Sequence, residues 1–392
     1  MFKFAIRPNL IYPFQLMIWN FIRTVDKLII IIILKFGISS IFTLLMFLGE
    51  FILGLIAYLY QKNFLSKNKE IPKFMSIILY QPRNILKIPD KKCKIMILLF
   101  FASFFDFVQF IITSYIIPKY FNLSMTLRER LCGIYAIISA LLFYYILKFQ
   151  IYKHQIFSLI IIGINLLIVI ITEFFFQEIN IFLSYRDLII AIIILMIHYL
   201  LNSSLDIIEK YLFELDYYNP FEALMWQGIF GFFITFVYCY EQNALNDIIQ
   251  YWNKNSLSNF VALMILFFLY IILSGVRNIF RVTTNKIYSP MTKALTDYIM
   301  NPATILFEFL IEKDFLTEKR RNYGYFFLNL IISIIITICG CIHNEILVLY
   351  FCGLEYQTHD QISKRAKYLD NEISSFPDDY SERIIFNEDI VD

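Results

Sequence analysis

Charged residues are scarce in this chain. Of its 392 residues, 17% are Asp, Glu, Lys or Arg, whereas 59% are hydrophobic. Soluble domains contain about 25% charged and about 45–50% apolar residues, so the composition excludes an ordinary cytosolic enzyme. The 34 basic and 32 acidic residues nearly cancel, to a net charge of +2. This balance gives no reason to expect nucleic acid as a partner.

Motifs that would hold a metal are also missing. The six cysteines form no CxxC pair, and the four histidines form no HExxH or similar spacing. We therefore expect no metal and no cofactor. We expect the cysteines to be buried thiols, namely Cys93, Cys132, Cys239, Cys339, Cys341 and Cys352. The N-terminal residues also lack the pattern of a removable signal peptide.

Long apolar runs dominate the sequence. A bilayer core about 30 Å thick needs roughly 20 mainly apolar residues per helix, and nine runs have about that length or more. They cover residues 36–60, 95–118, 127–149, 155–177, 186–208, 219–241, 257–280, 290–312 and 323–351. The sequence therefore predicts an all-α, polytopic transmembrane helical bundle, a multi-pass integral membrane protein whose outer surface contacts the lipid bilayer.

The first run leaves the number of spans open between nine and ten. As one helix, residues 28–60 would be about 50 Å long. This length is more than one span needs, but it is too short for two spans joined by a turn. The amphipathic segment 10–22 makes a short or interfacial first helix within residues 9–35 the alternative. We divide the chain into an N-terminal segment 1–35, two transmembrane parts 36–180 and 181–352, and a tail 353–392.

Loop charges predict the orientation. Residues 61–94 contain nine basic and two acidic residues, and short loops rich in lysine and arginine stay in the cytoplasm. Counting spans from this loop places the loops around Asn122, Ala244 and Lys319 on the opposite side. The tail, with ten acidic and four basic residues, then lies in the cytoplasm. Ten spans would place both ends of the chain there.

Several polar residues interrupt the apolar runs. A charge inside a bilayer is costly and normally faces a cavity or a partner. Glu50 lies within the first run, and Asp106 and Gln109 share one helix face because they are three residues apart. Asp206 and Lys210 are four residues apart and would pair within one helix. These side chains are interpreted either as lining an internal polar cavity or as interhelical hydrogen bonds.

The densest polar cluster lies between residues 274 and 302. Arg277 and Arg281 are one helical turn apart, and Lys293, Asp297 and Asn301 repeat that spacing. Arginine and lysine so arranged can bind a phosphate or a carboxylate. Anchoring at the cytoplasmic interface is the alternative, and it suffices for Lys286 and for Arg281. Pro302 would break or kink its helix within the membrane.

These motifs resemble the drug/metabolite transporter superfamily, in particular its nucleotide-sugar-transporter-like branch. The resemblance rests on the polar helix end from Arg277 to Lys286, Ser289-Pro290-Met291-Thr292, Asn301-Pro302, and the glycine-containing last span from Tyr323-Gly324 to Gly340. It implies two inverted five-helix repeats divided near residue 180. It also implies a secondary transporter in Golgi or endoplasmic reticulum membranes that exchanges a small polar metabolite, phosphorylated ones included.

In this interpretation a central site binds the substrate. Its side chains would be Arg277, Lys293, Asp297 and Asn301, with Asp106, Gln109 and Glu50 from the other half. The alternative is a non-transporting scaffold or accessory subunit whose polar residues only join helices. An intramembrane enzyme is not expected, because the sequence has no GxSxG, HExxH or paired-aspartate signature. The oligomeric state stays open.

Overall fold

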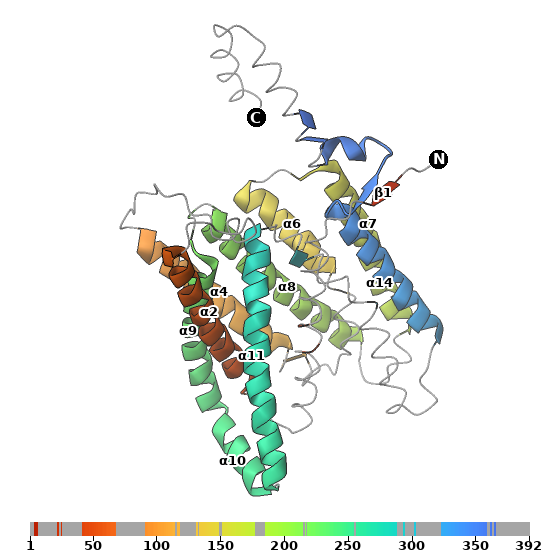
Figure 1. Cartoon of the computed structure of the whole chain (residues 1–392). Helices are drawn as coiled ribbons and strands as arrows, with labels where there is room; N and C mark the ends of the chain where they lie inside the picture. The colour runs from red at the N-terminus through yellow and green to blue at the C-terminus, as the bar shows by residue number, and fades with distance from the viewer. Residues whose placement is uncertain are drawn as a thin grey trace.

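The computed structural model describes residues 4–6, 22, 25, 41–67, 91–113, 116–117, 131, 133–148, 151–176, 185–214, 216, 218–254, 256–287, 293–294, 302, 323–358, 361–362 and 364–365. These residues are almost all helical (Figure 1). The helices are α2 (Phe42–Lys67), α4 (Lys91–Ile111), α6 (Gly133–Leu147), α7 (Lys153–Phe176), α8 (Tyr185–Glu214), α9 (Pro220–Glu241), α10 (Ala244–Lys254), α11 (Leu257–Ile287) and α14 (Tyr323–His343), with strands β1 (Phe4–Ile6) and β2 (Leu347–Leu349) and the short helix η5 (Leu354–Gln357).

Six helices in the described part of the chain are long and apolar enough to cross a bilayer. They are α2, α4, α7, α8, α9 and α11, while α6 and the apolar part of α14 are shorter. This result confirms the predicted class of all-α, multi-pass bundle. Two expected segments, the first helix within residues 9–35 and the run 290–312, lie almost wholly outside the described residues.

Helix α7 shows why these helices need lipid. Ile160, Ile164, Leu167 and Ile171 form an exposed stripe, each more than half accessible. The opposite face is equally apolar and packs inward, with Ile162 fully buried. A helix that is hydrophobic all round cannot be a surface helix in water, so the outward stripe is the surface that faces acyl chains.

Glycines bring α9 and α11 into close contact with α2. A Cβ atom on Gly275 of α11 would lie 2.5 Å from the carbonyl oxygen of Gly49 in α2, and one on Gly228 of α9 would collide with the backbone of Phe51. Small residues allow this approach, which drives helix association where lipid removes the hydrophobic contribution. The glycines therefore fix how α2, α9 and α11 face each other.

We expect Gly228→Ala to destabilise the bundle, because the added methyl group meets backbone that cannot move aside. Overpacking of this kind typically costs about 1–3 kcal/mol. The thermal unfolding midpoint in mild detergent should fall by several degrees. The matched control is Gly163→Ala in α7, where the nearest atom to a new Cβ, Ile137 Cδ1, is 4.0 Å away. Equal midpoints for the two variants would contradict this packing.

The last helix is shorter than the sequence predicted. The run 323–351 was expected to form one span, but α14 ends at His343 and Glu345 has a φ of 58°. The chain then forms β2, which pairs antiparallel with β1, joining Leu347 to Ile6 and Leu349 to Phe4. The N-terminal residues therefore lie beside the end of the last helix (Figure 1).

Other boundaries move by several residues. The predicted loop 61–94 is partly helical, because α2 continues to Lys67 and α4 starts at Lys91. Helix α8 continues to Glu214 and α11 to Ile287, beyond the apolar runs that predicted them. These extensions carry polar residues that take part in the site described below.

The prediction for the cysteines is wrong at two positions. Cys239 and Cys339 are buried and Cys341 is partly buried, as expected, but Cys93 and Cys352 are exposed. All five are thiols rather than disulfides, and Cys132 lies outside the described residues. Cys93 is exposed because it lies in the first turn of α4, and Cys352 because it follows β2 at the end of the bundle.

Candidate functional site

Arg281 lies at the centre of a buried charge network. It is 6% exposed, on α11, and its guanidinium meets carboxylates from three other helices. Nη1 is 3.1 Å from Asp106 of α4, and Nη2 is 3.2 Å from Glu209 of α8 and 3.6 Å from Glu50 of α2. The interpretation of Arg281 as an interfacial anchor is therefore wrong, because its side chain points into the bundle and not toward the headgroups.

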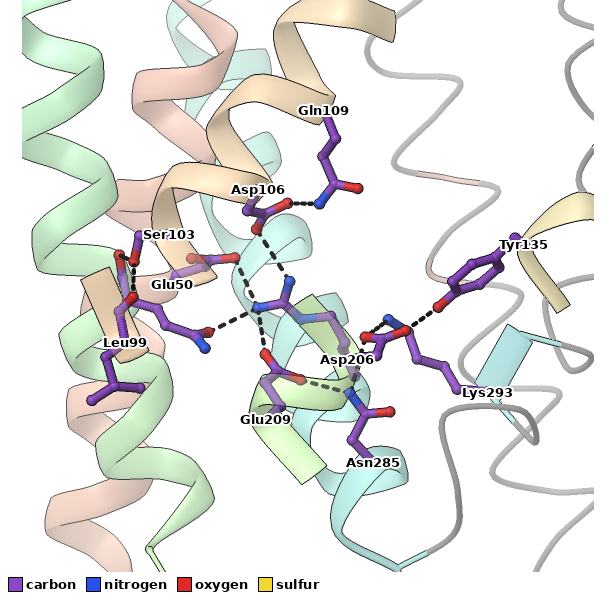
Figure 2. Close-up of polar contacts among 12 residues, drawn as sticks. Glu50, Leu99, Ser103, Asp106, Gln109, Tyr135, Asp206, Glu209, Asn285 and Lys293 are labelled. Atoms are coloured by element: carbon purple, nitrogen blue, oxygen red, sulfur yellow. Dashed lines mark hydrogen bonds and ion pairs between the residues drawn. The ribbon is translucent and has the colours of Figure 1, made fainter. Parts of the chain in front are cut away.

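A fifth helix completes the surroundings of Arg281. Gln227 of α9 accepts a hydrogen bond from Nη2 of Arg281 at 3.1 Å, and the Ser103 hydroxyl donates to the Gln227 carbonyl at 3.0 Å. Gln109 donates to Asp106 at 2.5 Å, so the predicted shared face of these two residues is confirmed (Figure 2). Helices α2, α4, α8, α9 and α11 therefore meet at one guanidinium.

A second ion pair continues the network. Lys293 lies 2.5 Å from Asp206 of α8, and Asp206 also accepts hydrogen bonds from the Tyr135 hydroxyl and, at 3.1 Å, from Asn285. Asn285 in turn donates to Glu209 at 2.6 Å. Figure 2 shows these side chains converging from α6, α8, α11 and residue 293. Asn285 thus joins the two ion-paired groups into one network.

The pairing predicted between Asp206 and Lys210 is wrong. Lys210 instead pairs with Glu214 at 2.8 Å, one turn further along α8. It also donates to the Lys286 carbonyl at 3.3 Å, while Lys286 donates to the Phe213 carbonyl at 2.9 Å. Each lysine so satisfies a carbonyl at the C-terminal end of the other's helix, which ties the ends of α8 and α11 together.

Negative charge exceeds positive charge in the network. Four acids, Glu50, Asp106, Asp206 and Glu209, face two bases, Arg281 and Lys293, and all six residues are at most 9% exposed. Arg277 is half-buried and its charge also acts on Glu50. Among the described residues, one carboxylate is left over even when Arg277 is counted. Buried charges are expected to be paired, so this excess makes the network a candidate functional site.

Several polar atoms of the same network make no hydrogen bond within the described part of the chain. They are both carboxylate oxygens of Glu50, Nε2 of Gln227, Nδ2 of Asn278, Nε of Arg281, Oε1 of Glu209 and Oδ1 of Asn285. Buried polar groups without partners are rare and costly. Donors and acceptors of this kind, gathered between helices, suit a site that binds a small polar molecule.

Neither a search of known protein-family models nor a search of curated proteins finds a match for this chain. The class of this protein is therefore inferred from its own sequence and structure. Its six long apolar helices indicate an integral membrane protein with several spans. Within the described residues no group of three or more His, Cys, Asp or Glu side chains is placed to hold a metal ion.

The structure gathers most of the predicted site residues. Glu50, Asp106, Gln109 and Lys293 lie in one network, and Arg277 is one turn from Arg281. Asp297 and Asn301 lie outside the described residues. The predicted site did not include Arg281 or Asp206, and it also missed the contributions of Glu209, Gln227, Asn285 and Tyr135.

A spacing signal for two of the missed residues is present in the sequence. Glu209 follows Asp206 by three positions, and Asn285 follows Arg281 by four, so each lies on the same helix face as a charged site residue. Gln227 and Tyr135 have no such signal.

Proposed function

We propose that this protein is a secondary transporter that moves a small polar metabolite across a membrane by alternating access. The observation that supports this most is the buried network around Arg281, to which five helices contribute ionisable or amide side chains. Ionisable residues inside transmembrane bundles typically mark substrate or ion pathways. Transporter sites of this kind lie where several helices meet within the membrane.

A purely structural role, in which the polar side chains only hold the helices together, explains the network less well than transport does. A buried ion pair contributes little net stability even when complete, because desolvation offsets the attraction. Within the described residues this network is incomplete, since acids outnumber bases and several donors and acceptors make no hydrogen bond. In a scaffold, replacing these buried charges with apolar side chains would increase stability. A transporter needs polar groups in its interior that can exchange one partner for another.

Helix directions support ten crossings. Helix α6 runs parallel to α8, with Tyr135 stacked on Tyr199 and Ser139 bonded to Ser203. The start of α7 therefore lies at the same end as the C-terminal end of α8, and His154 of α7 contacts Glu345 just after α14. The end of α14, and with it β1, lies at that end too.

Helix α2 runs the same way as α11, with Phe42 against Tyr270 and Gly49 against Gly275. The ends of α11 and α8 lie together, so α2 starts at the end of the bundle opposite to β1. The end of α11 and the start of α14 also lie at opposite ends of the bundle, because α14 ends on the side of β1. Eight apolar helices from α2 to α14 lie within the described residues, and the two spans that the sequence predicts within residues 9–35 and 290–312, almost wholly outside the described residues, would bring the number to ten.

The same directions fit two inverted halves divided between α7 and α8. In this division α2 and α9 are the second helices of the halves, and α7 and α14 are the last. Helices α2 and α9 pack antiparallel, with Gly54 against Met225 and Phe47 against Gly231. Helices α7 and α14 also pack antiparallel, since Ser158 near the start of α7 contacts His343. Antiparallel contact between equivalent helices is expected for inverted repeats.

The structure gives less support for a phosphorylated substrate than the sequence did. Arg281 and Lys293 already pair with carboxylates, so a phosphorylated substrate would have to use Arg277 or displace an internal acid. We therefore propose a small polar metabolite, carried in Golgi or endoplasmic reticulum membranes as the family resemblance implies.

Counterflow uptake into proteoliposomes tests the proposal. A panel of labelled nucleotide sugars, sugar phosphates, dicarboxylates and amino acids should contain at least one substrate with saturable uptake. We expect uptake to fall by about tenfold or more in Lys293→Ala and in Arg277→Ala, because each removes charge from the network. The control is Arg186→Ala, an exposed position at the start of α8. No uptake of any compound by well-folded protein would favour an accessory subunit instead.

A further inference from the structure

Glu50 differs from the other acids of the network. It is fully buried, in the interior of α2, and its nearest positive atom is Nη2 of Arg281 at 3.6 Å. Neither of its oxygens accepts a hydrogen bond within the described residues. Asp106, Asp206 and Glu209 each accept at least one, from Gln109, Asn285 and Asn285 respectively.

Every helix packed around Glu50 presents a polar group to it. Helix α4 contributes Asp106, α8 contributes Glu209, and α11 contributes Arg281 and Arg277. Helix α9 contributes Gln227, which is bonded to Arg281. Arg281 is thus shared by three carboxylates, and Glu50 at 3.6 Å is farther from it than Asp106 at 3.1 Å and Glu209 at 3.2 Å. Its single charge cannot neutralise the third.

We propose that Glu50 binds and releases the proton that couples transport to a pH gradient, an inference that rests on the proposed transport function. The supporting geometry is a buried carboxyl group with no hydrogen bond, beside an arginine already engaged by Asp106 and Glu209. When the site opens to water, Glu50 loses its proton and becomes a carboxylate. Reprotonation on the other side restores the neutral acid.

Loss of the proton also changes the contacts of Arg281. Nη2 contacts Glu209 and Gln227 as well as Glu50. An ionised Glu50 competes with both for this nitrogen and draws Arg281 toward α2 and away from α8. Proton binding is thereby linked to the position of α2 relative to α8, which is the kind of two-state contact that alternating access requires.

Infrared difference spectroscopy of the purified protein tests the assignment without any substrate. A pH change should produce a C=O band of a buried carboxylic acid in the wild type. The band should be lost in Glu50→Gln, shifted in Glu50→Asp and unchanged in Glu241→Gln, an exposed acid at the end of α9. A band that persists in Glu50→Gln, or a wild type without a titrating band, would overturn the proposal.

Two further measurements separate this inference from the transport proposal. Titration with NaCl against choline chloride at constant pH should leave the band unchanged, and its loss with sodium would assign Glu50 to a metal cation instead. In proteoliposomes an imposed proton gradient should accelerate uptake in the wild type several-fold and not in Glu50→Gln. Uptake that is insensitive to the gradient would overturn coupling but leave transport intact. A Glu50 band without uptake of any compound would overturn transport and coupling, and would leave only proton binding by Glu50.

Discussion

Arg281→Met should be the most destabilising single substitution in this protein. It leaves Asp106 and Glu209 buried without the guanidinium that lies 3.1 and 3.2 Å from them, and leaves Glu50 with only the half-buried Arg277 acting on it among the described bases. Breaking a buried ion pair by removing one partner costs about 3–5 kcal/mol, a large part of the roughly 5–15 kcal/mol that keeps a typical domain folded. We expect little monodisperse protein in mild detergent and a clearly lower thermal unfolding midpoint.

The control for this variant is Arg186→Met, which removes an exposed arginine from α8 and should leave the midpoint within a degree or two of the wild type. Arg281→Lys keeps the charge but loses the fork that reaches Asp106 and Glu209 at once, so an intermediate midpoint is expected. If Arg281→Met unfolded at the wild-type temperature, Arg281 would not neutralise these carboxylates.

The second large effect concerns the pair formed by Asp206 and Lys293. Lys293→Met alone should cost about 3–5 kcal/mol, because Asp206 is fully buried and keeps only neutral donors. The double variant Asp206→Asn, Lys293→Met should be more stable than Lys293→Met, since neither buried charge remains. A double-mutant cycle on unfolding midpoints in detergent measures this coupling.

Lys62→Met, an exposed lysine near the end of α2, is the control and should show no coupling to Asp206→Asn. Additive effects of Asp206→Asn and Lys293→Met would show that the two side chains do not meet. The cycle therefore also tests whether residue 293 lies against α8.

The helical class was predictable because of a simple physical constraint. A backbone in lipid must satisfy its own hydrogen bonds, so an apolar run of about 20 residues has few alternatives to a helix. The strands were not predictable. Each has three residues, and β1 finds its partner about 340 residues away in the sequence, where no local pattern identifies it. The end of α14 at His343 follows from that distant pairing.

The site was predictable in part, for a related reason. Glu50 and Asp106 stand out because acids are costly in the middle of a span. The sequence does not predict which arginine faces the interior of the bundle. Arg277 and Arg281 are one helical turn apart, and either one fits the pattern. The rotation of α11 is set by the contact of Gly275 with Gly49, and this contact is tertiary. Asp206 likewise pairs with Lys293, which is distant in the sequence, and not with nearby Lys210. Lys210 pairs instead with Glu214, so the spacing along α8 did not identify the partner of Asp206.

Accessibility of the network from each side of the membrane tests the central claim most directly. Asn278 is 2% exposed, its amide nitrogen lacks a partner among the described residues, and it lies one helical turn before Arg281 on α11, so Asn278→Cys in a cysteine-free background places a buried thiol one turn from the centre of the network. In sealed vesicles of known orientation, a membrane-impermeant thiol reagent should label this cysteine from either side, and a shift in pH should change the ratio of the two rates. Labelling from one side only, or from neither, would contradict alternating access.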